Sequence, residues 1–266
     1  MTVSFASIQA TPRVEDDSAV EVRSICKNYG EIEALRLIDL DFPRGKLTTL
    51  LGPSGCGKTT LLKIIAGLIE PTSGEVRVNG KIVTGPGPER AFVFQDFALM
   101  PWATVMRNVA FGLELKGMGK VERQSIARHY IAEVGLNGFE DKYPHELSGG
   151  MRQRVGLARA FAVNAEVLLL DEPFSAVDEQ NRRKFQEDLL QLVEKQRKTF
   201  IFVTHSIEEA VYVSDRIVLL SRRPSRVAQI IEPKIDRTAS PDAIRRDQGY
   251  LDTVEEIWQG LKHYVD

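Results

Sequence analysis

The feature that most constrains this chain is a glycine-rich segment between a predicted strand, Lys46–Leu51, and a predicted helix that starts near Lys58. Glycines let the backbone curl so that successive N–H groups point inward, and the helix adds the positive end of its dipole. The segment matches the P-loop pattern in full and predicts a nucleoside triphosphate site; the alternative is a chance glycine-rich turn. Lys58 is expected to reach the outer phosphates, and the Thr59 hydroxyl to ligate magnesium. The predicted nucleotide-binding residues of this loop are Gly52, Pro53, Ser54, Gly55, Cys56, Gly57, Lys58, Thr59 and Thr60.

A second apolar segment, Val167–Leu170, predicts a buried strand, and two carboxylates follow it directly. Side chains alternate along a strand, so Asp171 and Glu172 are expected to face different ways. Phosphoryl transfer depends on positioning and charge stabilisation. We therefore predict that Asp171 orients magnesium and that Glu172 polarises the attacking water. A solvated strand end is the alternative, which the presence of the P-loop disfavours.

Two further polar residues come at or just after predicted strands. His205 follows Thr199–Thr204, and Gln95 closes Ala91–Gln95. Ligands gather at this edge of parallel sheets, so both side chains are expected at the edge where the nucleotide binds. The amide oxygen of Gln95 is a candidate magnesium ligand. A structural role is the alternative for His205, because lone histidines at strand ends are commonly structural.

The arrangement of apolar segments predicts an α/β fold. Continuous apolar runs suit a parallel sheet covered on both faces, and helical segments lie between them. An alternating strand, Val20–Ile25, and a second, Gly74–Asn79, which ends at an Asn-Gly turn, predict an N-terminal antiparallel region. Helical patterning from about Thr104 to Val163 predicts an inserted helical subdomain. The predicted fold is a P-loop NTPase core with a mainly parallel sheet.

We divide the chain into a flexible N-terminal tail (residues 1–18), a catalytic domain (19–232, with the helical insertion at about 97–163) and a C-terminal helical tail (233–266). Ser240-Pro241 predicts a helix start, with a cap followed by proline at the first position. The apolar face of the following helix is expected to pack onto the core. That face comprises Leu251, Val254, Ile257, Trp258 and Leu261.

Composition excludes some classes of protein. The net charge of −2 lacks the basic excess of a nucleic-acid binder, so no nucleic-acid partner is expected. No apolar run reaches the roughly 20 residues that a membrane-spanning helix needs. Two cysteines suggest no disulfide framework. We expect a soluble, cytoplasmic protein.

The segment Leu147–Arg154 (LSGGMRQR) resembles the signature of ATP-binding-cassette (ABC) ATPases, and the likeness extends from about Val20 to Glu232. In that family two ATP molecules are enclosed in a head-to-tail dimer, each between one chain's P-loop and the other chain's signature. The resemblance therefore implies ATP and Mg²⁺ as cofactors and a second ATPase subunit as partner, expected to be an identical chain. The signature residues implied to contact ATP are Ser148, Gly149, Gly150 and Gln153.

The same resemblance implies further roles. Asp178 belongs to the loop that crosses the dimer interface, and Tyr29 stacks on adenine, although an ordinary loop aromatic is the alternative for Tyr29. Gln95 corresponds to the magnesium-sensing loop and His205 to the switch histidine. Two positions depart from the commonest pattern, Met151 in the signature and Val177 in the interface loop. Neither removes a phosphate-binding group.

The stretch from Gln95 to Val105, with its Pro101-Trp102 pair, looks most like the nitrate/sulfonate/taurine branch of importer ATPases. That likeness implies transmembrane permease subunits as partners, a periplasmic or extracellular solute-binding protein acting indirectly, and a peripheral location on the cytoplasmic face of the membrane. The apolar residues Leu99, Met100 and Trp102 are expected to line a groove for a permease helix, or alternatively to be buried under the helical insertion. Competing functional interpretations are an ABC ATPase that acts on ribosomes or DNA, and a P-loop kinase.

Cys56 lies in the N–H-rich loop at a helix start, where a thiolate is favoured. We therefore expect bound ATP to protect Cys56 from alkylation. A structural cysteine is the alternative.

Overall fold

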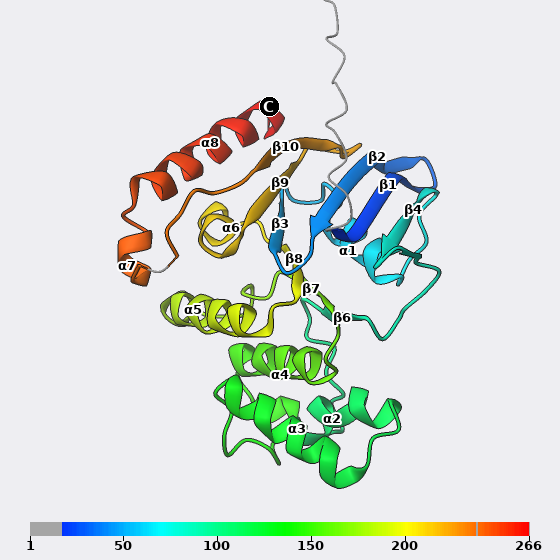
Figure 1. The fold of residues 1–266 in the computed structure, drawn as a ribbon, viewed down its shortest axis with the longest axis vertical. Coiled ribbons are helices and arrows are strands. Elements are labelled where there is room, and N and C mark those ends of the chain that lie inside the picture. Colours follow the sequence, from blue (N-terminus) through cyan, green and yellow to red (C-terminus); the bar gives the residue numbers. More distant parts are fainter. Residues whose placement is uncertain (1–17, 238, 266) are drawn as a thin grey trace, which may run out of the picture.

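The computed structural model describes residues 18–237 and 239–265, and its main element among these is a six-stranded sheet (Figure 1). Neighbouring strands pair in parallel except for the last two in the chain, which are antiparallel. This arrangement confirms the predicted α/β fold with a mainly parallel sheet. The strand order is β10 (Val227–Ile231), β9 (Arg216–Leu220), β3 (Leu47–Leu51), β8 (Thr199–Val203), β7 (Val167–Asp171) and β6 (Arg90–Val93).

Both faces of this sheet are buried, which explains why its strands are continuously apolar. Successive side chains of a strand point to opposite faces. Leu168 and Leu170 therefore enter the core on the side of the helices that follow β6 in the chain, whereas Leu169 enters a second core against α1 (Lys58–Ala66). The parallel connections bring the ends of β3, β7 and β8 to one edge of the sheet, where the P-loop also lies.

The second core is closed by an antiparallel sheet. Among the described residues its strand order is β2 (Ile32–Pro43), β1 (Ser18–Tyr29), β4 (Ser73–Val78) and β5 (Lys81–Ile82). The long strand β2 was not anticipated from the sequence. Leu37 has φ 49 and sits at an irregularity in the pairing with β1, so the alternation of apolar residues changes phase in mid-strand.

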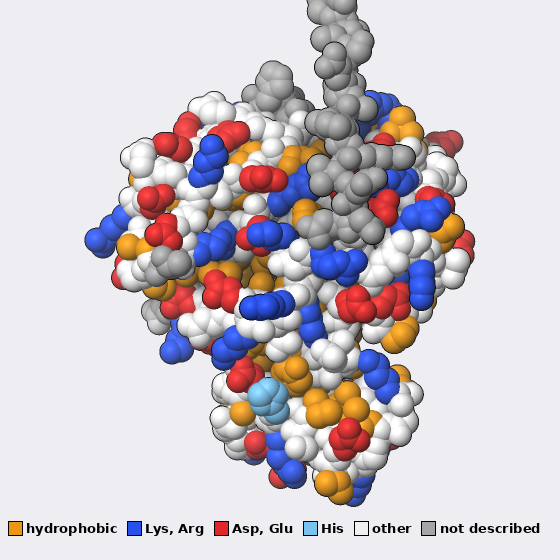
Figure 2. Space-filling view, in the orientation of Figure 1, with side chains coloured by type: hydrophobic (Ala, Val, Ile, Leu, Met, Phe, Trp, Pro, Cys, Tyr) orange, Lys and Arg blue, Asp and Glu red, His pale blue; other side chains and the backbone are white. Residues whose placement is uncertain are grey.

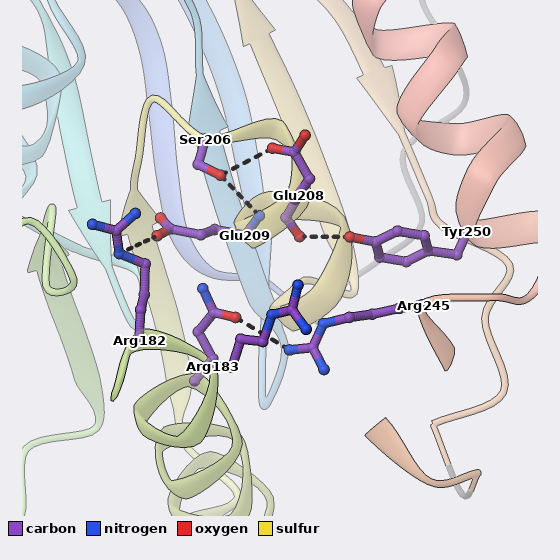
Figure 3. A pocket seen from close by; sticks show the side chains of 8 residues that line it. Arg182, Arg183, Ser206, Glu208, Glu209, Arg245 and Tyr250 are labelled. Carbon is purple, nitrogen blue, oxygen red and sulfur yellow. Dashed lines mark hydrogen bonds and ion pairs between the residues drawn. The ribbon is translucent and has the colours of Figure 1, made fainter. Parts of the chain in front are cut away.

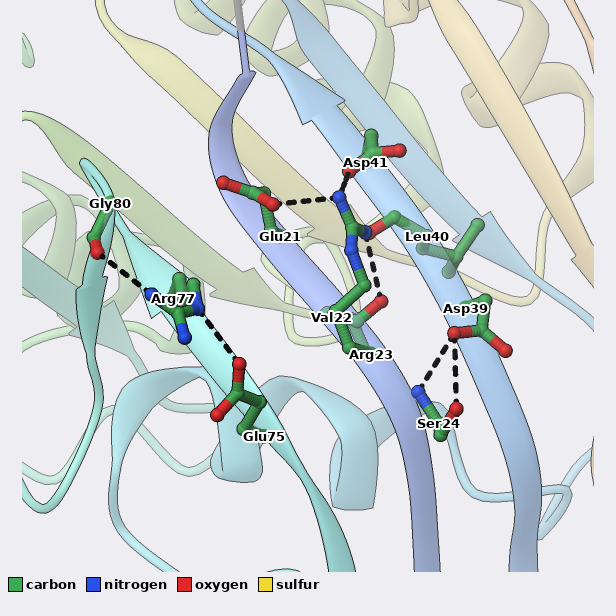
Figure 4. Close-up of polar contacts among 10 residues, drawn as sticks. All are labelled: Glu21, Val22, Arg23, Ser24, Asp39, Leu40, Asp41, Glu75, Arg77 and Gly80. Atoms are coloured by element: carbon green, nitrogen blue, oxygen red, sulfur yellow. Dashed lines mark hydrogen bonds and ion pairs between the residues drawn. The ribbon is translucent and has the colours of Figure 1, made fainter. Parts of the chain in front are cut away.

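Polar contacts on the outer face fix how these strands pair (Figure 4). Arg23 of β1 donates to Glu21 at 2.7 Å and to the Leu40 carbonyl at 3.3 Å, and it pairs with Asp41 across the strands. The backbone N–H of Ser24, which also has a positive φ, donates to Asp39 at 2.8 Å. Such exposed pairs contribute little stability. They show which residues of β1 and β2 lie opposite each other, and β1 itself ends at Tyr29.

Three helices lie between β6 and β7 and form the lower lobe of Figure 1. Thr104 caps the first by accepting a hydrogen bond from the N–H of Arg107. Phe161 of the third helix is buried between Tyr130 and Phe200, with ring centroids 6.3 and 6.1 Å away, and so joins this lobe to the sheet. The helices are α2 (Val105–Leu115), α3 (Lys120–Glu133) and α4 (Gly149–Ala162), with a 3₁₀ turn at Pro144–Glu146.

The C-terminal helices cover α6 (Ile207–Val213) and the β9 end of the sheet. In α8 (Gln248–Val265) Ile257 is fully buried, as the predicted apolar face requires. The prediction is wrong for Leu251 and Trp258, which are about half exposed because they lie on the outer side of that face. The preceding elements are α5 (Glu179–Gln196) and α7 (Pro241–Ile244).

No helix in residues 18–237 and 239–265 is long and apolar enough to cross a membrane. The predicted N-terminal tail, residues 1–18, lies outside the described residues except for Ser18.

Candidate functional site

The P-loop joins β3 to α1, and its glycines are required by close approach of the backbone. A Cβ at Gly52 would lie 2.6 Å from the carbonyl oxygen of Leu220, and Gly57 has φ 114, a conformation open to glycine. Lys58 is buried, and its Nζ donates to the carbonyls of Gly52 at 2.8 Å and Pro53 at 2.9 Å. The lysine charge is therefore held inside the loop, where phosphate oxygens can replace the backbone carbonyls as acceptors of its hydrogen bonds. This arrangement fits a nucleotide.

The predicted magnesium ligands Thr59 and Asp171 lie together. The Thr59 hydroxyl donates to Asp171 Oδ1 at 2.8 Å, across the gap between α1 and the end of β7. Burial raises the pKa of the Asp171 carboxyl, and the hydrogen bond from Thr59 only partly offsets this effect. The carboxylate and the hydroxyl together supply hard oxygen ligands, and a divalent cation bound to them would neutralise the buried carboxylate charge. Bound there, Mg²⁺ would supply charge stabilisation to the phosphates.

The three predicted catalytic side chains meet at the same sheet edge. Glu172 Oε2 accepts a hydrogen bond from Gln95 Nε2 at 3.4 Å and lies 3.3 Å from His205 Nδ1. Asp171 instead contacts Thr59, so the two carboxylates have different partners, as alternation predicts. Glu172 has φ 46, an uncommon conformation for a residue with a side chain, of the kind found at functional sites.

The strand that leads to Gln95 is shorter than predicted. β6 ends at Val93, because the chain turns where the Phe97 N–H bonds back to the carbonyl of Phe94. Phe97 and Ala98 both have positive φ. The Arg159 guanidinium of α4 donates to the carbonyls of these two residues at 2.8 and 2.6 Å. The Gln95 loop is therefore tied to the helical lobe as well as to the sheet.

The signature residues lie at the start of α4. Ser148 caps the helix, and its Oγ accepts a hydrogen bond from the N–H of Met151 at 3.3 Å. A Cβ at Gly149 would come within 2.9 Å of the Ala176 carbonyl, so the signature touches the loop that leads to the exposed Asp178. Gly150 shares this start of the helix. Gln153 is fully buried, with neither amide atom bonded to a described residue, and so faces the interior.

The remaining predicted nucleotide contacts are placed as follows. Tyr29 ends β1 with half of its surface exposed, and Lys27 Nζ lies 5.1 Å from its ring centroid. Ser54 and Gly55 are exposed at the tip of the P-loop, and Thr60 is half-buried in α1.

The predicted thiolate at Cys56 is wrong. The side chain is buried, and burial raises the pKa of the thiol by more than the neighbouring Lys58 lowers it. The loop provides N–H groups as expected, but it also seals the sulfur from water. Cys56 is therefore a packed structural cysteine with a neutral thiol.

The apolar residues after Gln95 differ in their exposure. Leu99 packs against the core of the helical lobe, whereas Trp102 is 74% exposed. Burial under the helical insertion is therefore wrong for Trp102. Figure 2 shows further apolar side chains on the surface of this lobe. Its exposed large apolar residues are Trp102, Phe111, Leu115, Val121, Phe139 and Tyr143.

A buried polar link, missed from the sequence, connects the His205 loop to the loop of Asp178. Glu209 is almost fully buried, and its Oε2 accepts a hydrogen bond from Thr204 at 2.5 Å. Its Oε1 pairs with Arg182 Nε at 3.9 Å, while Arg182 Nη2 donates to the Val177 carbonyl at 3.2 Å. Glu209 and Arg182 border a cavity of about 360 Å³ between α5, α6 and the C-terminal helices (Figure 3). The sequence signal that could have revealed this link is an acidic residue on the apolar side of α6.

A P-loop, a hydroxyl–carboxylate pair and a glutamate beside a histidine at one sheet edge define a nucleotide-hydrolysing P-loop protein. Comparison with known proteins narrows the class. Residues 35–175 match the ABC transporter family. The chain is 53% identical, over 90% of its length and 88% of the relative, to an uncharacterised ABC transporter ATP-binding protein of Methanocaldococcus jannaschii.

Two further comparisons add detail. The chain is 46% identical to the taurine import ATP-binding protein TauB of Pseudomonas syringae, covering 84% of this chain and 87% of TauB. It superposes with a TM-score of 0.72 on a dimeric ATP-binding cassette in a post-hydrolysis state bound to ADP and Pi, at 33% identity, covering 80% of this chain and 98% of the other. The chain belongs to the ABC transporter family, and it is an ATP-binding subunit with ABC-type ATPase activity.

Proposed function

We propose that this ATPase energises the import of a small solute of the nitrate, sulfonate or taurine class. The main support for this proposal is the likeness of the chain to the taurine import protein TauB across most of both chains. The Pro101-Trp102 pair supports the same branch. The chain would then act at the cytoplasmic face of the membrane, bound to permease subunits that receive solute from a binding protein.

The working unit in this proposal is a head-to-tail dimer of two such cassettes. The exposed start of α4, capped by Ser148, offers free N–H groups to an anion. The P-loop with Lys58 offers a second set on a different part of the surface. ATP would be enclosed when the P-loop of one subunit meets Ser148 of the partner subunit. The dimeric state of the related cassette bound to ADP and Pi supports this arrangement.

Within that site, each predicted residue has a role that its contacts support. Lys58 and the loop N–H groups bind phosphate oxygens, and Thr59 with Asp171 holds Mg²⁺. Glu172 orients the attacking water and accepts its proton. His205 and Gln95, both within 3.4 Å of the Glu172 carboxylate, keep it in position. Because the Gln95 loop is anchored to α4 through Arg159, changes at the nucleotide would move the helical lobe.

The solute class is tested with the assembled complex. ATP turnover should rise when the binding protein is loaded with taurine, an alkanesulfonate or nitrate. Stimulation by solutes of a different class alone would refute the proposed class.

Docking to the permease is tested at Trp102, which is too exposed to serve the core. Trp102→Ala should weaken assembly with the permease and leave ATP turnover by the isolated subunit near the wild-type value. Trp258→Ala is the matched control, because Trp258 is also exposed but lies on α8. Equal loss of assembly in both variants would contradict a docking role for Trp102.

A further inference from the structure

The loop between β9 and β10, residues 221–226, lies directly against the P-loop. The last residue of β9, Leu220, has its carbonyl oxygen 2.6 Å from where a Cβ of Gly52 would be. Ser225 is buried; its N–H donates to the Ala34 carbonyl at 3.1 Å, and its own carbonyl accepts from the Arg36 N–H at 2.9 Å. The loop is therefore held on one side by the P-loop and on the other by β2.

Arg223 reaches from this loop to the middle of the P-loop. A Cβ built at Gly55 would lie 3.3 Å from Arg223 Nη2, and Gly55 itself has φ 72. The Arg223 side chain is exposed, and no hydrogen bond or ion pair joins it to any residue that the structure describes. Arg222, the preceding residue, is also exposed but has no comparable approach to a P-loop glycine. One free guanidinium thus lies at the edge of the phosphate cradle.

The chemistry of this position favours an anion. The backbone N–H groups around Gly55 are turned toward phosphate oxygens in a loop of this type. A guanidinium offers a planar set of N–H donors that matches phosphate geometry and stays charged at all working pH values. Lys58 already serves the inside of the loop, bonded to Gly52 and Pro53. Arg223 approaches the loop from outside and would reach oxygens that Lys58 does not cover.

We propose that Arg223 is a further nucleotide-binding residue, donating hydrogen bonds to phosphate oxygens of the nucleotide held by the P-loop of its own subunit. It belongs to none of the sequence segments that define the family site. The inference depends on nucleotide binding at this P-loop and is independent of the solute class proposed above.

The test compares Arg223→Met with Arg222→Met, which removes the same charge one residue away. The measurement is the Kd of ADP and of a non-hydrolysable ATP analogue for the isolated subunit, at protein concentrations where it is monomeric. Loss of a charge-assisted hydrogen bond predicts about five- to tenfold weaker binding in Arg223→Met. Binding by Arg222→Met should stay within about twofold of wild type, since general charge effects on exposed groups are small and screened by salt.

Two results would overturn the proposal. One is an equal loss of nucleotide binding in both variants. The other is a wild-type Kd in Arg223→Met; if ATP-dependent dimerisation were then weaker, the guanidinium would act on the partner subunit instead. Because the side chain is exposed, both variants should keep the wild-type Tm, which excludes unfolding as the cause of a changed Kd.

Discussion

The buried carboxylate of Glu209 stabilises the fold through two contacts. Glu209→Ala removes the acceptor of the Thr204 hydroxyl and one partner of the Arg182 ion pair. A buried donor left without an acceptor costs about 1–3 kcal/mol. The ion pair adds only about 0.5 kcal/mol, because Arg182 is one-third exposed. The free energy of unfolding should therefore fall by about 2–3 kcal/mol.

Glu209→Gln separates the hydrogen bond from the charge. Burial raises the pKa of the Glu209 carboxyl, because the charged form is less well solvated inside the protein than in water. A glutamine keeps an acceptor for Thr204 and avoids the cost of a buried charge. We expect its free energy of unfolding to lie within about 1 kcal/mol of wild type, as is usual when no buried partner is left unsatisfied.

The assay is thermal unfolding of the isolated subunit without nucleotide, followed by ATP turnover. In a chain of this size Glu209→Ala should lower the Tm by about 5–10 °C, and Glu209→Gln by much less. Glu208→Ala is the matched control, because Glu208 is the exposed neighbour and, among the described residues, its carboxylate bonds only to Ser206. A Tm for Glu209→Ala within about 2 °C of wild type would contradict a stabilising role for the Glu209 contacts.

Two further predictions concern buried ionisable groups. Because Cys56 is buried and its thiol is neutral, alkylation should label Cys56 more slowly than the half-buried Cys26, as measured by mass spectrometry. The rate at Cys56 should be the same with and without ATP. Strong ATP protection of a fast-reacting Cys56 would contradict this. Burial raises the pKa of Asp171, so the stability that its protonation gives is present below the unfolded pKa of about 3.9 and is lost as pH rises through the folded value. Asp171→Asn without nucleotide should therefore have a higher Tm than wild type at pH 7.5, with the difference shrinking as the pH falls toward the folded pKa of Asp171. It should also bind ATP without the gain in affinity that Mg²⁺ gives wild type. A lower Tm at pH 7.5 would count against the buried charge.

The parts of the site that could be predicted are those whose residues lie close together in the sequence. The P-loop specifies its own conformation, since glycine positions, Lys58 and Thr59 lie within one turn between a strand and a helix. The run ending at Asp171 identifies a central strand by its composition alone. The sheet edge then follows, because parallel strands end together and bring Glu172 and His205 within reach of each other.

What escaped prediction depends on contacts between distant segments or on local bulges. The strand β2 was hidden because a bulge at Leu37 changes the phase of its apolar pattern. Glu209 and Arg182 lie 27 residues apart in sequence, and nothing local pairs them. The pKa of Cys56 depends on burial, which the N–H-rich sequence does not reveal. Arg223 belongs to a loop whose position beside Gly55 comes from the sheet order and from hydrogen bonds between Ser225 and β2.

The proposed enclosure of ATP between Lys58 of one subunit and Ser148 of another can be tested by trapping the enclosed state. Glu172→Gln should bind ATP, hydrolyse it very slowly and elute as a dimer in size-exclusion chromatography. The double variant Glu172→Gln with Ser148→Arg should bind ATP with an unchanged Kd yet remain monomeric. A double variant that still dimerises with ATP, or that loses ATP binding as a monomer, would contradict a serine acting across the subunit interface.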